Sequence, residues 1–93
     1  MMNSQIIEIF GNDLAKLIHK PAIACKGLIR FAITDYFKKT GKQTSLGFEQ
    51  FMEIVNTQIK ERLRVAKFDN IDSIIESLKR KIVTEQGIFT MNK

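Results

Sequence analysis

The stretch PAIACKGLIRFAITDYFKK, residues 21–39, predicts a central helix that is apolar around most of its circumference. At about 100° per residue, Phe31 and Phe37 flank one broad apolar arc made of Ala22, Ala24, Cys25, Leu28, Ile29, Ala32, Ile33 and Tyr36. A helix apolar over so wide an arc has packing partners on more than one side. We therefore expect Leu28 and Ile29 at the centre of the core, where truncation to alanine costs about 2–5 kcal/mol.

The segment before it, from Ser4 to Lys20, predicts a first helix. Its apolar face follows the spacing i, i+4, i+8, i+11, i+12 and consists of Ile6, Phe10, Leu14, Leu17 and Ile18. Residues 11–13 are Gly-Asn-Asp, and each of them disfavours a helix interior. We expect the helix to bend there or to split in two. Lys20 precedes Pro21, which favours a helix boundary at that point.

The segment after it, TGKQTSLG at residues 40–47, predicts a loop in which Gly41 caps the central helix and Thr44 or Ser45 caps the next one. A further helix is expected from Leu46 to Val65 or Lys67. Its apolar stripe is Phe48, Phe51, Met52, Val55, Ile59, Leu63 and Ala66. Arg62 falls at the edge of this stripe. We interpret it as a side chain whose methylenes pack while its head reaches water, with a buried salt bridge or an interface anchor as the alternatives.

A last helix is predicted from Ile71 to about Thr84, capped by Asp69 or Asn70. Its stripe is Ile71, Ile74, Ile75, Leu78 and Ile82, with Glu76 and Arg80 spaced for an i, i+4 ion pair. After Gly87 comes an apolar tail that either docks or forms one short strand. The fold class we expect for residues 1–93 is therefore all-α. It is a single compact bundle of four helices, or five if the first helix splits, with a short apolar C-terminal tail.

The size of the chain favours association. With 93 residues and 44% hydrophobic residues, apolar burial and conformational entropy nearly cancel, so a lone domain is marginal. A homo-oligomer or a bound protein partner relieves that. The apolar side chains of the tail are the candidate interface: Ile88, Phe89 and Met91. The tail either places them on a partner or docks them on its own bundle.

Few residues point to chemistry. One histidine, His19, and one cysteine, Cys25, give no zinc spacing, and the loop at residues 40–47 has no carboxylate for calcium. Gly41 and Lys42 lack the earlier glycine and the following hydroxyl of a phosphate-binding loop. We expect no cofactor, no metal and no enzymatic activity. Cys25 is expected to be a small buried thiol.

Basic residues are unevenly distributed. The formal net charge is +5, and residues 14–42 carry seven cationic side chains against Asp35 alone. These seven are the candidate surface for an anionic partner: Lys16, Lys20, Lys26, Arg30, Lys38, Lys39 and Lys42. The alternative is a solvated face on a basic protein.

The function that these observations favour is a non-enzymatic protein–protein interaction or regulatory module that acts through helix faces and self-associates. The alternative is a small basic nucleic-acid-binding protein, although no helix-turn-helix or aromatic stacking platform is present in the sequence. No run of 18 apolar residues predicts a transmembrane helix, and the first residues do not resemble a secretory signal. With a single cysteine, we expect a cytoplasmic protein.

Overall fold

The computed structural model describes residues 4–41 and 46–91, and nearly all of this part of the chain is helical. Its elements are α1 (Ser4–Ile18), α2 (Ala22–Thr40), α3 (Phe48–Ile54), η1 (Val55–Ile59), α4 (Lys60–Val65), α5 (Ile71–Thr84) and α6 (Gln86–Met91). α3, the π-helical η1 and α4 follow one another without a break and form one long helix. The predicted all-α bundle is confirmed. With the long helix counted once, the described residues form five helices.

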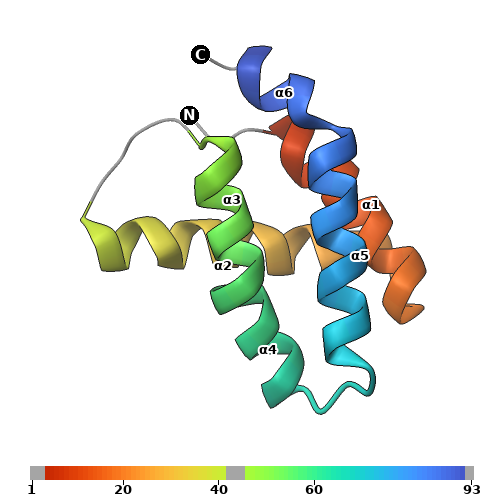
Figure 1. Ribbon diagram of the computed structural model, residues 1–93. Helices are drawn as coiled ribbons and strands as arrows, with labels where there is room; N and C mark the ends of the chain where they lie inside the picture. The colour runs from red at the N-terminus through yellow and green to blue at the C-terminus, as the bar shows by residue number, and fades with distance from the viewer. Residues whose placement is uncertain (1–3, 42–45, 92–93) are drawn as a thin grey trace.

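The helices form two crossed layers (Figure 1). The long helix α3–η1–α4 and α5 lie side by side and run in opposite directions, joined by a short loop, and α2 crosses behind the long helix. α1 packs against α2 and α5, and α6 lies beyond the end of α5, against α3. The radius of gyration is 12.2 Å, close to the value of about 12.3 Å for a compact chain of this length.

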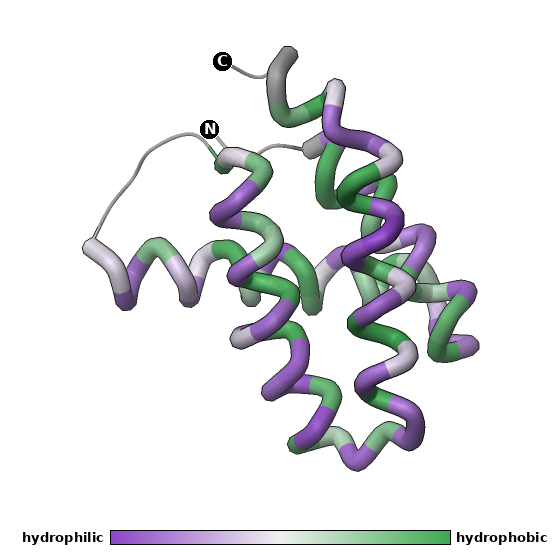
Figure 2. Tube along the Cα trace, in the orientation of Figure 1, coloured by the Kyte–Doolittle hydropathy of each residue, from purple (hydrophilic) through white to green (hydrophobic). Residues whose placement is uncertain are grey.

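One apolar cluster fills the space between the layers, and the apolar segments of the tube in Figure 2 recur along every helix. Its centre is aromatic. The ring centroids of Phe10 on α1 and Phe51 on α3 are 4.9 Å apart, and Phe89 on α6 lies 5.9 Å from Phe51. Phe48 meets Phe89 edge-on at 6.1 Å. Tilted and edge-on pairs are the favoured aromatic geometries, so three separate segments are joined at this point.

The apolar tail is helical, so the expectation of a short strand is wrong. Ile88 and Phe89 are consecutive residues, and both are buried, at 7% and 5% exposure. A strand would point such neighbours to opposite faces, whereas a helix turns them by only about 100° and lets both face the core. For these two side chains the structure shows docking on their own bundle. The side chain of Met91 lies outside the described residues.

The first helix does not split at Gly11, so the predicted alternative of two short helices is wrong. α1 continues through Gly-Asn-Asp because Gly11 lies under α2. A Cβ atom added at Gly11 would come within 2.4 Å of the Cγ atom of Lys26 and 3.0 Å of its Cα atom. The residue that weakens α1 locally is therefore the residue that lets α1 and α2 approach closely.

α2 buries a narrower face than its sequence predicts. The fully covered side chains are Cys25, Ile29, Ala32 and Ile33, whereas Ala24 is exposed. Ile29 is at the core centre, as expected, but Leu28 is only partly buried and packs at the margin of the core. Leu28→Ala therefore removes fewer contacts than Ile29→Ala and costs less. The apolar arc of α2 is divided between the core and a surface.

The π-helical turn η1 explains the stripe of the long helix. Phe51, Val55, Ile59 and Leu63 recur every fourth residue, and on a regular α-helix that spacing drifts by about 40° per step. The structure buries all four completely. Within η1 the N–H of Lys60 donates to the carbonyl of Val55, five residues back, so the turn holds one extra residue and cancels the drift. Ala66, the last predicted member of the stripe, is exposed.

The helix ends agree with the sequence in part. Gly41 caps α2 in the left-handed conformation, φ 72°, and its N–H donates to the carbonyl of Phe37 at 3.0 Å. Asn70 caps α5 at φ 57° without a side-chain hydrogen bond. Gly47 precedes α3, and the predicted caps Thr44 and Ser45 lie outside the described residues. Glu76 pairs with Lys79 at 3.6 Å rather than with Arg80.

Two glycine substitutions test the helix crossing. Gly11→Ala should lower the free energy of unfolding by about 1–3 kcal/mol, because the added methyl overlaps Lys26. The matched control is Gly27→Ala in α2, where an added Cβ meets nothing within 4 Å. This control should raise the stability by up to about 1 kcal/mol, since alanine is the better helix former. Urea unfolding gives both values, and a Gly11→Ala protein as stable as the wild type would contradict the crossing.

Deleting one residue tests the π-helical turn. Removing the exposed Thr57 should turn η1 into regular α-helix and leave Phe51, Val55, Ile59 and Leu63 on the core face, so the protein stays folded. Removing the exposed Glu76 from the regular helix α5 should instead rotate Leu78 and Ile82 out of the core and cost several kcal/mol. Circular dichroism during thermal melting compares the two deletions. Equal losses of stability would show that η1 does not accommodate an extra residue.

Candidate interaction surface

A groove lies between α2 and α4 on the side of α2 that the core leaves uncovered. Its volume is about 500 Å³, and its lining is Ala24, Gly27, Leu28 and Phe31 from α2 with Glu61, Arg62, Val65 and Ala66 from α4. Six of these eight residues carry no charge. Three of them, Ala24, Gly27 and Ala66, have small side chains, and this is why the space between the two helices is not filled.

Large apolar side chains stand exposed around this groove. Phe31 and Val65 in its lining are 64% and 67% exposed, and Ile23 is 85% exposed. On α2, Ile23, Gly27 and Phe31 are spaced i, i+4, i+8 and so share one face of the helix. Among the described residues the remaining large apolar side chain with high exposure is Val83 on α5, at 48%. Single exposed apolar residues are ordinary, whereas a group of them beside one groove makes this face the candidate interaction surface.

Arg62 occupies the rim of the groove. Its guanidinium carbon lies 5.7 Å from the ring centroid of Phe31, a cation–π contact between α4 and α2. The extra residue in η1 places Leu63 in the core, so Arg62, its neighbour, faces outward. Of the predicted alternatives for Arg62, the buried salt bridge is wrong, because the residue is exposed.

The carboxylate of the groove is already neutralised. Glu61 accepts hydrogen bonds from two nitrogens of Arg64, three residues further along the same helix. The hydrogen bond from Arg64 lowers the pKa of the Glu61 carboxyl below its ordinary value. Glu61 is therefore ionised at neutral pH with its charge directed to Arg64.

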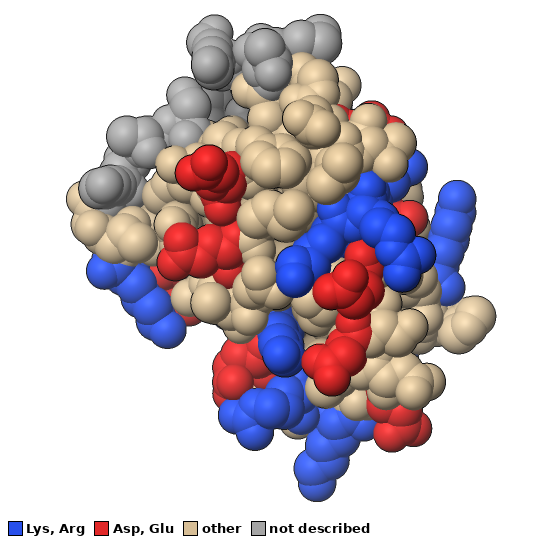
Figure 3. All heavy atoms as spheres, viewed as in Figure 1, with Lys and Arg blue, Asp and Glu red and all other residues tan. Residues whose placement is uncertain are grey.

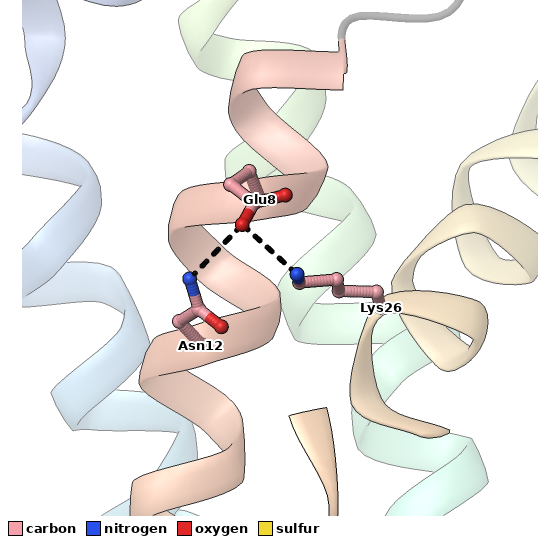
Figure 4. A network of polar contacts seen from close by, with 3 residues as sticks. All are labelled: Glu8, Asn12 and Lys26. Carbon is pink, nitrogen blue, oxygen red and sulfur yellow. Dashed lines mark hydrogen bonds and ion pairs between the residues drawn. The ribbon is translucent and has the colours of Figure 1, made fainter. Parts of the chain in front are cut away.

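The predicted basic surface is divided by the fold. Lys26 pairs with Glu8 of α1 at 2.9 Å, and Asn12 donates to the same carboxylate at 3.4 Å (Figure 4). Lys39 pairs with Asp35 at 3.8 Å. The ammonium of Lys20 lies 6.0 Å from the ring centroid of Phe68. The exposed side chains of the set without an ion pair to a described residue are those of Lys16, Lys20, Arg30 and Lys38. Lys42 lies outside the described residues.

These cations do not converge on one face. Arg30 and Lys39 are nine residues apart on α2, which places them on opposite sides of the helix. On the face drawn in Figure 3, blue and red atoms alternate rather than forming a uniform patch. Two cations of α2, Lys26 and Lys39, are thus paired with carboxylates, and Lys39 lies on the other side of the helix from Arg30.

His19 and Cys25 offer little chemistry. His19 is exposed at the end of α1 with φ 57°. Cys25 is buried as expected, and burial raises the pKa of its thiol, which disfavours the reactive thiolate. Within residues 4–41 and 46–91, no three His, Cys, Asp or Glu side chains gather closely enough to hold a metal ion.

The sequence analysis identified the tail as a candidate interface but did not identify the groove. Ile88 and Phe89 are buried, whereas Ile23, Phe31 and Val65 are exposed. The spacing of Ile23, Gly27 and Phe31 could have indicated a second apolar face on α2, opposite the core face. The sequence analysis did not identify this face because it assigned all apolar residues of α2 to one core.

Comparison with protein-family models, with curated proteins and with solved structures yields no match. In the described part of the chain no helix has the length and apolar character needed to cross a membrane. The functional argument therefore rests on the groove and on the placement of charge.

The divided basic surface makes a prediction for nucleic acids. If the four cations without an ion pair, Lys16, Lys20, Arg30 and Lys38, each neutralise one phosphate, affinity should fall roughly 150-fold between about 50 and about 200 mM salt, against about 10³–10⁵ for a dedicated binder. Fluorescence anisotropy with a labelled DNA duplex should therefore show weak binding without sequence preference. A salt-resistant, sequence-selective complex would contradict this and favour the nucleic-acid alternative.

Proposed function

We propose that this chain is a non-enzymatic protein–protein interaction or regulatory module that uses the groove between α2 and α4 as its binding face. The observation that carries the proposal is the exposure of two large apolar side chains, Phe31 at 64% and Val65 at 67%, in the lining of one groove. Leaving these two large apolar side chains in water forgoes the roughly 1.5–3 kcal/mol that burial of each would supply. A partner that covers the groove recovers this free energy.

The proposal changes the residues expected at the interface. Sequence analysis assigned self-association to the tail, but Ile88 and Phe89 are covered by their own bundle. Any association that keeps this bundle intact, with a second copy or with another protein, has the α2–α4 groove available instead. The cytoplasmic location remains part of the proposal as a default, since the single cysteine gives no evidence of an oxidising compartment.

A nucleic-acid function is the weaker candidate. It needs several cations in reach of one backbone, and here Lys26 and Lys39 are paired with carboxylates while Arg30 and Lys39 point to opposite sides of α2.

Site-specific photo-crosslinking tests the proposal. A benzophenone amino acid placed at position 31 should yield a discrete protein adduct in the native host, because position 31 lies at the groove. The matched control places the same group at position 83, the exposed apolar position on α5. The mass of the adduct distinguishes a second copy from another protein. No adduct from position 31, or equal adducts from both positions, would contradict the groove as the binding face.

A further inference from the structure

The rim of the groove carries positive charge that nothing in the described chain neutralises. Arg62 makes its cation–π contact with Phe31 but has no ion pair and donates no side-chain hydrogen bond to a described residue. The neighbouring carboxylate, Glu61, is taken by Arg64. The lining therefore combines an apolar floor with one uncompensated guanidinium.

Two more cations adjoin residues of this lining in the sequence. Arg30 immediately precedes Phe31 on α2, and Lys67 immediately follows Ala66 at the end of α4. Both are exposed, and neither forms an ion pair with a residue that the structure describes. Arg62 is the one cation of the lining, and the one carboxylate of the lining, Glu61, is paired with Arg64.

The contact with Phe31 holds the guanidinium of Arg62 in position before a ligand binds. The ring restrains the long side chain, so less conformational entropy is lost when its N–H donors meet an acceptor. Carboxylates match the fork of the guanidinium and accept two parallel hydrogen bonds from it. The polar group that fits this position is a carboxylate.

The dimensions of the groove fit a protein segment. The groove is shallow and open, with sides from two helices and small residues, Ala24, Gly27 and Ala66, that admit side chains from a partner. The stretch from Ala24 to Phe31 spans seven steps, or about 10 Å, along α2. That length matches two turns of a partner helix, with apolar side chains at i, i+4 and i+7.

We infer that the groove binds an acidic amphipathic helix of another protein, whose apolar ridge enters between α2 and α4 and whose carboxylate pairs with Arg62. This inference rests on the proposed function, since it uses the same groove. A second copy of the chain is the poorer occupant, because it brings the same uncompensated cations to the interface and like charges oppose association.

The test is selection from a displayed library of helical peptides of about 16 residues, roughly four turns. Each peptide has a fixed apolar ridge and randomised flanking positions, so the library itself reports the preferred charge. Selection on the wild-type protein should enrich Asp and Glu beside the ridge. Binding of a selected peptide should be lost with Phe31→Ser and retained with Val83→Ser, the exposed apolar control on α5.

Charge reversal identifies the partner of the carboxylate. Arg62→Glu should weaken the selected peptide about tenfold, and a peptide with the matching Glu→Lys change should recover affinity for that variant. The control is Arg80→Glu, an exposed arginine on α5 that should leave binding unchanged. All four substitutions are at exposed positions, and circular dichroism confirms that each variant is folded.

Each remaining outcome overturns the inference in a distinguishable way. If the selected peptides need Phe31 for binding but show no enrichment of Asp or Glu, the inference that a partner carboxylate pairs with Arg62 is refuted. The proposed interaction function is then unaffected. If no selected peptide depends on Phe31 for binding, the inference that the groove binds a helix is refuted. The photo-crosslinking experiment then tests the proposed function separately. Phe31-dependent sedimentation with phosphatidylserine vesicles would assign the groove to a lipid surface. A concentration-dependent dimer that Phe31→Ser abolishes would assign it to a second copy.

Discussion

The structure depends on the close approach of α1 and α2 at Gly11. The absence of a side chain there allows the backbone of α2 at Lys26 to rest against α1, and the same lysine reaches Glu8 at 2.9 Å. The pair is partly exposed to solvent, so its own contribution to stability is small. Once α2 is held in this way, Cys25, Ile29, Ala32 and Ile33 face the core.

That orientation of α2 also determines which of its residues line the groove. α1 covers one flank of α2 and the core covers a second, so the flank with Ala24, Gly27 and Phe31 faces α4 across the groove. The long helix contributes through its π-helical turn, because the extra residue buries Leu63 and directs Arg62 toward Phe31. Two local features therefore position the residues of the groove. The missing side chain at Gly11 positions the apolar residues of α2, and the extra residue in η1 positions Arg62.

Much of the fold was predictable, because it follows from local periodicity. The helix limits at Ile71 and Thr84, and the left-handed cap at Gly41, agree with the sequence analysis. The continuity of α1 was not predictable, since Gly11 is unfavourable in a helix until a neighbour uses its space. The groove was not predictable either, because an apolar residue such as Phe31 looks the same in a sequence whether it faces a core or water.

Nuclear Overhauser contacts between α1 and α2 test the central claim most directly. Protons on the Cα atom of Gly11 should give strong cross-peaks to the side-chain protons of Lys26, because a Cβ atom added at Gly11 would lie only 2.4 Å from the Cγ atom of Lys26. Such cross-peaks in the full-length protein are the predicted result. Their absence, with Gly11 Cα protons in contact only with their own helix or with solvent, would contradict the crossing on which both the core and the groove depend.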